Sequence, residues 1–215
     1  MSPLKKALVL VVLCSFMAAR AFATERAMPA AATSASETAT LAAGCFWGTE
    51  ELFRKVPGVL ETRVGYTGGH LKNPTYEDTS TGTTGHAESV EIKFDPTKVQ
   101  YEQLLTLFFK MHDPTTLNRQ GHDIGTQYRS AIYYHSPQQK ATAEQTIREL
   151  GEARRFANPI VTEVAPLTAF YKAEPYHQEY FAHNPFQPYC QAVVGPKVAK
   201  FRKQYGERLK KTAAT

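Results

Sequence analysis

The sequence predicts an α+β protein, a two-layer α/β sandwich with a mixed sheet of the split βαβ kind. Segments with alternating apolar residues are interspersed with segments whose apolar residues recur every three or four positions. Their order is strand, helix, strand, strand, helix, strand, helix, strand, with no internal repeat and no convincing domain linker. A chain of 215 residues, 42% of them hydrophobic, is long enough to bury one substantial core.

Residues 1–23 are predicted to be a secretory signal peptide. Lys5 and Lys6 form a basic start, an apolar run follows from Ala7 to Ala19, and Ala21-Phe22-Ala23 fits an A-x-A cleavage site. An uncleaved anchor is the weaker alternative, because the apolar run is short for a bilayer. We therefore expect export without a stable membrane anchor, most simply to a periplasm.

The charge pattern argues against nucleic-acid binding. Removing the leader removes Lys5, Lys6 and Arg20 but no acidic residue, which lowers the formal net charge from +5 to +2. The remaining basic residues are concentrated between Lys197 and Lys211, at a spacing typical of the exposed face of a terminal helix. No aromatic stacking pattern accompanies them. We expect a monomer without a nucleic-acid partner.

Residues 24–38 are predicted to be a flexible lead-in, because they are rich in Ala, Ser and Thr and show little apolar periodicity. A single domain is expected to follow over residues 39–211. Within it, Ala39–Ala43 is a short strand that runs into Gly44. A helix with an apolar stripe begins at Cys45.

The middle of the chain is predicted to alternate between strands and loops. Pro57-Gly58 forms a turn before the strand Val59–Tyr66. The glycine-containing stretch Thr67–Gly85 is a loop, and a loop of this length is usually functional or disordered. The strand Ala87–Asp95 follows, and the apolar spacing then indicates a helix from Tyr101 to about His112.

The last third begins with a second polar loop, Thr115–Gln127, and the strand Arg129–His135. Ser136 is placed to cap a helix with Pro137 at its first position, and this helix runs to about Arg155. The remaining expected elements are the strand Ile160–Pro166, a short helix Glu174–His183 and a last helix Val198–Lys210.

The segment Gly44-Cys45-Phe46-Trp47-Gly48-Thr49-Glu50-Glu51 places a cysteine at the start of the first helix. Unpaired backbone N–H groups and the helix dipole favour a thiolate there, so the pKa of Cys45 is expected to fall and the sulfur to become a nucleophile. Phe46 and Trp47 offer an apolar wall beside it. The alternative is a buried structural cysteine in an aromatic core.

Glu88 lies in the strand Ala87–Asp95 with the same parity as Val90, Ile92 and Phe94. A carboxyl group at the edge of an apolar face loses solvation, which raises its pKa and keeps a proton on it. Glu88 is therefore a candidate acid. The alternative is that Glu88 lies at the end of the strand and reaches water.

After cleavage of the leader, Cys45 and Cys190 are the remaining cysteines. Two cysteines in an oxidising compartment normally form a structural disulfide. Two features favour a different interpretation. Cys45 starts a helix, and Cys190 ends the proline-rich stretch Pro185–Cys190, which is predicted to be a loop. A cysteine on a movable loop suits a bond that forms and breaks.

Several separate segments together resemble peptide methionine sulfoxide reductase A (MsrA), the family that reduces the S epimer of methionine sulfoxide. The match extends from about Thr40 to about Tyr189. It implies a ferredoxin-like core and a single catalytic reductase domain. The matching segments are Gly44–Glu51, Asn73-Pro74-Thr75-Tyr76, Gly85-His86-Ala87-Glu88, Gln120–Gly125 and Gly125–Ser130.

The resemblance assigns a role to each part of the reaction. A thiolate can attack a sulfoxide only if the oxygen is stabilised and protonated as it leaves. Cys45 is similar to the family's nucleophile and Glu88 to its proton donor. Phe46 and Trp47 match the aromatic pair that holds the substrate methyl group.

The remaining assignments concern the hydroxyl donors and the second thiol. Tyr76 and Tyr128 match the hydroxyl donors, and Asp123 matches an active-site aspartate. Cys190 lies where the first resolving cysteine is expected, so a sulfenic acid on Cys45 would give a disulfide. The tail lacks the further cysteine of one common family pattern. A two-cysteine cycle is therefore implied, in which an external dithiol, thioredoxin or a thioredoxin-like protein, acts as reductant. The resemblance also implies oxidised proteins and peptides as substrates and no bound cofactor.

A papain-like hydrolase is the nearest alternative enzyme. Cys45 at a helix start could pair with His177 or His183, with an asparagine such as Asn184 as the third group. Neither local signature of that family is present.

Two non-redox alternatives remain. An exported binding module stapled by a Cys45–Cys190 disulfide would gain roughly 3 to 5 kcal/mol in the chain-entropy model. A metal site is weaker, because the histidines lack ligand spacing on any one predicted helix. These histidines are His112, His122, His135, His177 and His183.

Overall fold

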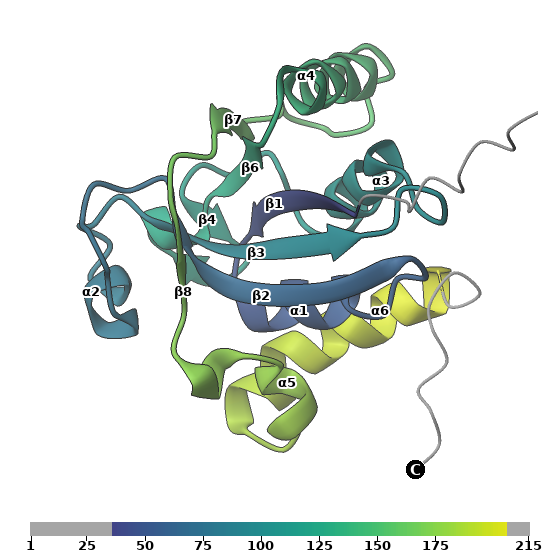
Figure 1. Cartoon of the computed structure of the whole chain (residues 1–215). Helices are drawn as coiled ribbons and strands as arrows, with labels where there is room; N and C mark the ends of the chain where they lie inside the picture. The colour runs from purple at the N-terminus through teal and green to yellow at the C-terminus, as the bar shows by residue number, and fades with distance from the viewer. Residues whose placement is uncertain (1–35, 206–215) are drawn as a thin grey trace, which may run out of the picture. The chain divides into compact units, whose positions relative to one another are not determined.

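The computed structural model describes residues 36–205, which form a six-stranded sheet and the helices that pack on it (Figure 1). The predicted signal peptide, most of the predicted lead-in and the end of the predicted domain lie outside this range. Within residues 36–205, none of the helices combines the length and apolar character needed to cross a lipid bilayer.

The six strands lie in the order β7-β6-β1-β3-β2-β8, and β6 and β7 are the parallel pair in an otherwise antiparallel sheet. Strands β6-β1-β3-β2 and the helices α1 and α3 form a split βαβ unit, which confirms the predicted mixed sheet and ferredoxin-like core. The strands are β1 Glu37–Ala43, β2 Val59–Thr67, β3 Ala87–Phe94, β6 Ser130–Tyr134, β7 Glu163–Pro166 and β8 Phe170–Lys172.

The longer helices occur close to their predicted positions. The Ser136 hydroxyl accepts a hydrogen bond from the Gln139 N–H at 3.2 Å, so the predicted cap of α4 is confirmed. Helix α6 begins before the predicted Val198, and the predicted residues beyond position 205 lie outside the described range. The helices are α1 Phe46–Phe53, α3 Tyr101–Met111, α4 Pro137–Glu152 and α6 Gly195–Tyr205.

Several short elements occur where the sequence predicted loops or a single helix. Thr75 and Asp78 form a capping box that starts α2 inside the predicted Thr67–Gly85 loop. The predicted helix Glu174–His183 is two separate turns, because Glu179 between them has a φ of 52°. The short elements are α2 Tyr76–Ser80, β4 Arg119–Gln120, β5 Asp123–Ile124, η1 Thr126–Tyr128, η2 Pro175–His177 and α5 Tyr180–His183.

The prediction of a loop through Pro185–Cys190 was wrong at its end. Pro188 and Tyr189 are already helical, and a π-helical turn (η3, Cys190–Val194) continues directly into α6. A proline is compatible with the first turn of a helix, where its missing N–H would have no partner in any case. Cys190 therefore lies at the start of a helical segment.

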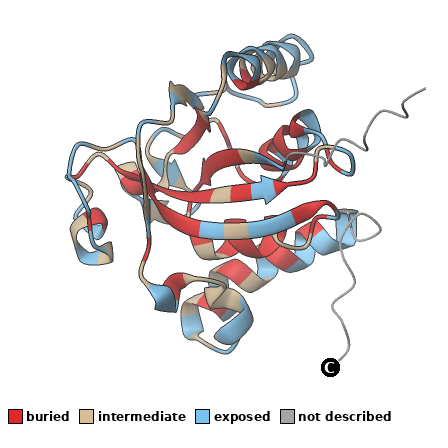
Figure 2. Cartoon of the chain, in the orientation of Figure 1, coloured by how far each residue is buried: buried red, intermediate tan, exposed pale blue. Residues whose placement is uncertain are grey.

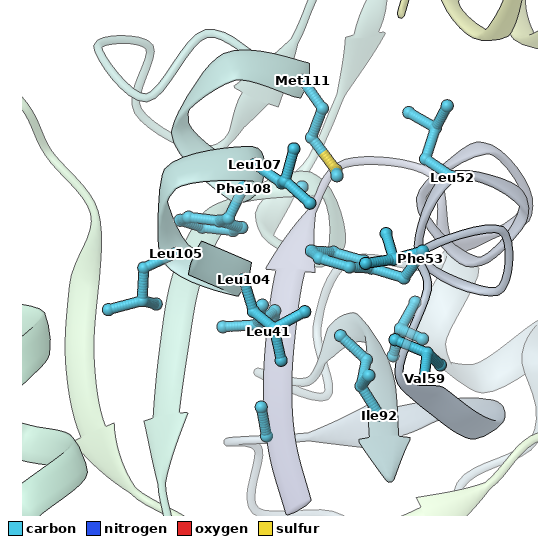
Figure 3. Packing of buried hydrophobic residues seen from close by; sticks show 14 of the residues in the cluster. Leu41, Leu52, Phe53, Val59, Ile92, Leu104, Leu105, Leu107, Phe108 and Met111 are labelled. Atoms are coloured by element: carbon cyan, nitrogen blue, oxygen red, sulfur yellow. The ribbon is translucent and has the colours of Figure 1, made fainter. Parts of the chain in front are cut away.

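The main core lies between the sheet and the helices. Figure 3 shows Phe53 of α1 and Leu104 and Phe108 of α3 facing Leu41 of β1 and Ile92 of β3. All five residues are fully buried. Side chains alternate between the two faces of each strand, and the opposite face of the sheet carries a much smaller hydrophobic cluster. That cluster contains Ala42, Ala87, Ala131 and Tyr133.

Helix α1 is buried on nearly every side, as its colouring in Figure 2 shows. It packs against β2, β3, α5 and α6, so its polar residues need internal partners. The Glu51 carboxylate pairs with Arg54 at 3.0 Å and with Arg202 of α6 at 2.8 Å. Neither Glu50 nor Glu51 lies in the first turn of α1, so neither is placed at the positive end of the helix dipole.

Candidate active site

Cys45 lies at the junction between β1 and α1. Gly44 has a φ of 82°, and a Cβ at this position would lie 2.6 Å from the side chain of Gln120, so the turn requires glycine. The chain bends there, and Cys45 becomes the N-cap residue of α1. The predicted placement of the thiol at a helix start is confirmed.

The predicted lowering of the Cys45 pKa is wrong for the unliganded site. Burial raises the pKa of the Cys45 thiol, and the negative charge of Glu88 raises it further. The Trp47 N–H at the helix start and the Tyr189 hydroxyl hydrogen-bond to the sulfur and act in the opposite direction, but they do not offset burial. The helix start thus supplies the expected N–H donor to the sulfur, but the net pKa of Cys45 is raised and not lowered.

Glu88 reaches the helix start from β3. Its side chain is buried, with the residue 3% exposed, and its Oε2 accepts the backbone N–H of Phe46 at 2.9 Å. That N–H belongs to the first turn of α1, where it has no partner within the helix. Burial raises the pKa of Glu88 to about 8 although this hydrogen bond acts to lower it. The prediction that Glu88 is buried is confirmed, the direction of its pKa shift agrees with the prediction, and the alternative that it reaches water is wrong.

Tyr76 and Tyr128 come from the two segments predicted as polar loops. Tyr76 is the first residue of α2, and Tyr128 ends the turn η1. Burial raises the pKa of both phenols, that of Tyr76 to about 12, and the charges of Glu88 and Cys45 raise both further. Both hydroxyls therefore stay protonated and are able to donate hydrogen bonds.

Asp123 and Tyr189 form a second polar pair at the sulfur. The Tyr189 hydroxyl donates to Asp123 Oδ2 at 2.6 Å and also hydrogen-bonds to Cys45. Both residues line a cavity of about 510 Å³ that also includes Cys45 in its wall. Glu88, Tyr76 and Tyr128 are not in the wall of this cavity.

The two aromatic residues after Cys45 have different environments. Phe46 is buried, and its ring centroid lies 5.9 Å from that of Tyr66. Trp47 stacks on Tyr180 at 3.8 Å between centroids, and its indole N–H donates to His177 Nδ1 at 3.0 Å. These contacts do not involve the sulfur, so the roles of Phe46 and Trp47 as its apolar wall and as the seat of the substrate methyl group stay predictions.

Sequence reasoning missed the polar group that supports these rings. The Tyr66 hydroxyl and the Tyr76 backbone N–H both donate to the Glu174 carboxylate at 2.9 Å. His177 is 1% exposed, and its Nε2 lies 4.0 Å from Glu174 without a hydrogen bond. The sequence analysis predicted a short helix for the aromatic and polar residues after Ala173 and considered His177 only in the hydrolase and metal-site alternatives.

Cys190 is fully buried in the η3 turn, directly after Tyr189. Burial raises the pKa of the Cys190 thiol. Cys45 and Cys190 are both free thiols in this structure. Cys190 thus lies in a helical turn and not in the movable loop that the sequence predicted.

Within the described range, no group of three or more His, Cys, Asp or Glu residues could hold a metal ion. The candidate groups for the chemistry are the sulfur of Cys45 at the start of α1, the carboxyl of Glu88 on β3, and the phenols of Tyr76 in α2 and Tyr128 in η1. A sulfur atom that can change its oxidation state beside a proton donor characterises a thiol-dependent oxidoreductase.

Comparison with known proteins specifies the family. The model of the peptide methionine sulfoxide reductase family matches residues 37–209. A curated MsrA of Methanothermobacter thermautotrophicus is 60% identical over 69% of this chain and 88% of its own, and one of Saccharolobus solfataricus is 50% identical over 81% and 97%. The solved methionine sulfoxide reductase A of Corynebacterium diphtheriae has a TM-score of 0.64 and 43% identity, covering 71% of this chain and 76% of that one.

The chain belongs to the MsrA family of peptide methionine sulfoxide reductases. It is an oxidoreductase that reduces methionine sulfoxide. The hydrolase, metal-site and binding-module alternatives lose their basis, because this family assignment covers nearly all of the described residues.

Proposed function

We propose that the enzyme reduces the S epimer of methionine sulfoxide, free or within peptides, through a sulfenic acid on Cys45 and a disulfide with Cys190. The observation that carries this proposal is the placement of Glu88, a carboxyl protonated at neutral pH, against the first N–H of the helix that Cys45 begins. Nucleophile and acid are thus fixed by the same helix start.

In the first step the Cys45 sulfur attacks the sulfoxide sulfur. A sulfur–sulfur bond forms as the sulfur–oxygen bond of the substrate breaks and the oxygen leaves as water. A water molecule then attacks the Cys45 sulfur, the sulfur–sulfur bond breaks, and methionine leaves as the thioether, so the sulfoxide gains two electrons and the cysteine loses two. Glu88 supplies a proton to the oxygen, and Tyr76 and Tyr128 donate hydrogen bonds to it. The products are methionine and a Cys45 sulfenic acid.

In the second step the Cys190 thiol condenses with the sulfenic acid, which releases water and forms a disulfide. Cys190 directly follows Tyr189, whose hydroxyl hydrogen-bonds to Cys45, so the chain already brings this segment to the nucleophile. An external dithiol, thioredoxin or a thioredoxin-like protein, then opens the disulfide by thiol exchange. No bound cofactor takes part in this cycle.

We further propose that the substrates are oxidised exported proteins and that the enzyme acts as a monomer, most simply in a periplasm. The sequence of residues 1–23 supports export, because it combines a basic start, an apolar run and an A-x-A site. Fractionation of cells that produce the full chain, with the mature N-terminus determined by mass spectrometry, tests this. An intact residue 1 on protein from the cytoplasm would contradict export.

The proposed reaction is tested with peptides that carry one or the other epimer of methionine sulfoxide and dithiothreitol as reductant. We expect consumption of the S epimer alone. Consumption of the R epimer, or of neither, would overturn the proposal.

The disulfide step has its own test. Cys190→Ser should complete about one stoichiometric round and then cycle slowly with a protein dithiol, because the resolving thiol is absent. Normal cycling would show that the reductant attacks the sulfenic acid directly.

A further inference from the structure

Lys197 of α6 is a basic residue near Cys45 whose neighbouring cavity does not include Glu88. It lines the cavity of about 510 Å³ together with Cys45 and Asp123. Its Nζ donates to the backbone oxygen of Ala43 at 3.4 Å, at the end of the strand that leads to the nucleophile. Neither the family motifs nor the proposed reaction step assigns a role to this lysine.

The first reaction step needs negative charge on Cys45, and the site opposes it. Burial raises the pKa of Cys45, and the charge of Asp123, together with that of Glu88 once Glu88 has lost its proton, raises it further. A nearby cation is the ordinary means of offsetting such a penalty. Three lysines line the cavity, but Lys110 and Lys200 are exposed to solvent, where screening weakens their charges, and Lys197 is half-buried.

The charge of Cys45 acts on the pKa of Lys197. Burial lowers the pKa of Lys197, while the charges of Cys45 and Asp123 oppose this lowering and favour the ammonium form. A thiolate on Cys45 therefore stabilises the cation that stabilises it. This reciprocity is strongest where water is excluded.

Other charged and titratable groups act on the same pair. Those around Cys45 are Glu88 of β3, Asp123 of β5, Tyr76 of α2, Tyr128 of η1 and Tyr189 before η3. Those that share the cavity wall with Lys197 are Lys110, His112 and Asp113 at the end of α3, His122 beside β5 and Lys200 on α6.

We infer that Lys197 is a positioning residue whose ammonium group supports the thiolate of Cys45 in the first step. This inference rests on the proposed role of Cys45 as the nucleophile. Lys197 acts through the sulfur and through the Ala43 carbonyl that fixes the end of β1, and it need not touch the sulfoxide.

A purely structural role is the alternative, because the same hydrogen bond ties α6 to β1. Two variants separate the roles. Lys197→Gln keeps an N–H donor for the Ala43 oxygen and removes the charge, whereas Lys197→Arg keeps the charge, and the adjoining cavity has room for the larger head group. Lys200→Gln is the matched control, since it removes an exposed lysine from the same helix and the same cavity.

The experiment measures the pH dependence of iodoacetamide alkylation at Cys45 in the full reduced chain, with the modified peptide quantified by mass spectrometry. We expect Lys197→Gln to raise the midpoint by about one pH unit and to slow alkylation near neutral pH by about tenfold. Lys197→Arg should restore most of the rate, and Lys200→Gln should shift the midpoint by no more than about a third as much.

An unchanged midpoint in Lys197→Gln would overturn the inference, as would an equal shift in Lys200→Gln. A lower melting temperature of Lys197→Gln with the wild-type midpoint would assign Lys197 to structure alone and would also overturn it. Alkylation does not require sulfoxide turnover. Failure of the proposed function would therefore appear separately, as wild-type protein that does not consume the S epimer.

Discussion

Two buried glutamates lie at helix α1 and have different roles, Glu50 within the helix and Glu88 at its start. Glu88 from β3 is 3% exposed and Glu50 within α1 is 1% exposed, and burial raises the pKa of both, to about 8 and about 7. They differ in their hydrogen bonds. The Glu50 carboxylate accepts from the Thr62 hydroxyl at 3.1 Å and from the Glu179 N–H at 2.7 Å, whereas within the described range Glu88 accepts from the Phe46 N–H alone.

This difference in hydrogen bonding assigns a structural role to Glu50 (the anchor) and the role of proton donor to Glu88 (the reagent). Both oxygens of Glu50 are engaged, and the bond to Glu179 holds a residue with a φ of 52°. The next residue, Tyr180, stacks on Trp47, so Glu50 supports the aromatic wall from a distance. Glu88 has one oxygen without a protein hydrogen bond, which leaves it able to act on a substrate. A raised pKa alone therefore does not identify the acid.

The largest effect is expected from replacing the nucleophile Cys45, which lies next to Glu88 at the start of α1. Cys45→Ser should reduce methionine sulfoxide consumption by more than about 10⁴-fold, because a hydroxyl at this position is a far weaker nucleophile. The Glu50 hydrogen bonds should be unaffected, so the melting temperature should remain close to that of the wild type. Single-turnover consumption of an S-epimer peptide measures the first quantity and calorimetry the second. Turnover at the wild-type rate would refute the assignment of Cys45.

The next effect compares the two carboxyls directly. Glu88→Gln should slow the reduction step by roughly 10² to 10⁴-fold, because an amide does not supply the proton that the leaving oxygen needs. Glu50→Gln, the matched control, should change the same rate by less than about tenfold, since it acts only through the position of Trp47. The measurement is the single-turnover rate near neutral pH. Equal rates in the two variants would remove the distinction between anchor and reagent.

Local patterns were sufficient to predict the parts of the site that lie on regular elements. Glycine before Cys45 and the apolar stripe after it placed the thiol at a helix start, and alternation along β3 placed Glu88 on the core face. Tyr76 and Tyr128 were assigned by resemblance alone, because their segments have no strong periodicity. The short elements around them are set by caps and turns.

Features that depend on long-range packing could not be predicted. The sequence does not show that Trp47 would contact His177 and Tyr180, because these contacts form only when the chain after β8 returns to α1. The direction of the Cys45 pKa shift was missed for the same reason. A helix start lowers the pKa of a thiol locally, while the burial that raises it comes from the whole fold.

A smaller effect concerns the stability that Glu50 provides. Glu50→Gln retains one acceptor oxygen, so either the Thr62 hydroxyl or the Glu179 N–H loses its partner inside the protein. The expected loss is about 1 to 3 kcal/mol in the free energy of unfolding. Urea unfolding near neutral pH measures it, with Glu77→Gln on the exposed surface of α2 as control. A variant as stable as the wild type would mean that water replaces the lost partner.

The smallest effect is a pH dependence of stability that distinguishes the two carboxyls. In the unfolded chain a glutamate ionises near pH ~4.3, while the folded pKa is about 8 for Glu88 and about 7 for Glu50. Each folded carboxyl keeps its proton where the unfolded chain has lost it, so its contribution is full below pH ~4 and falls as the pH rises to the folded pKa. Between about pH 7 and pH 8, Glu88 is the one of these two carboxyls whose ionisation still changes the free energy of unfolding.

The difference in unfolding free energy between wild type and each variant isolates these contributions from those of the histidines and Lys197. For Glu88→Gln the difference should keep changing between about pH 7 and 8, with a slope of at most about 1.4 kcal/mol per pH unit. For Glu50→Gln it should change below about pH 7 and level off above. If the Glu88→Gln difference is flat over that interval, Glu88 is already ionised in the folded protein, and a carboxylate without a proton cannot be the acid of the first step.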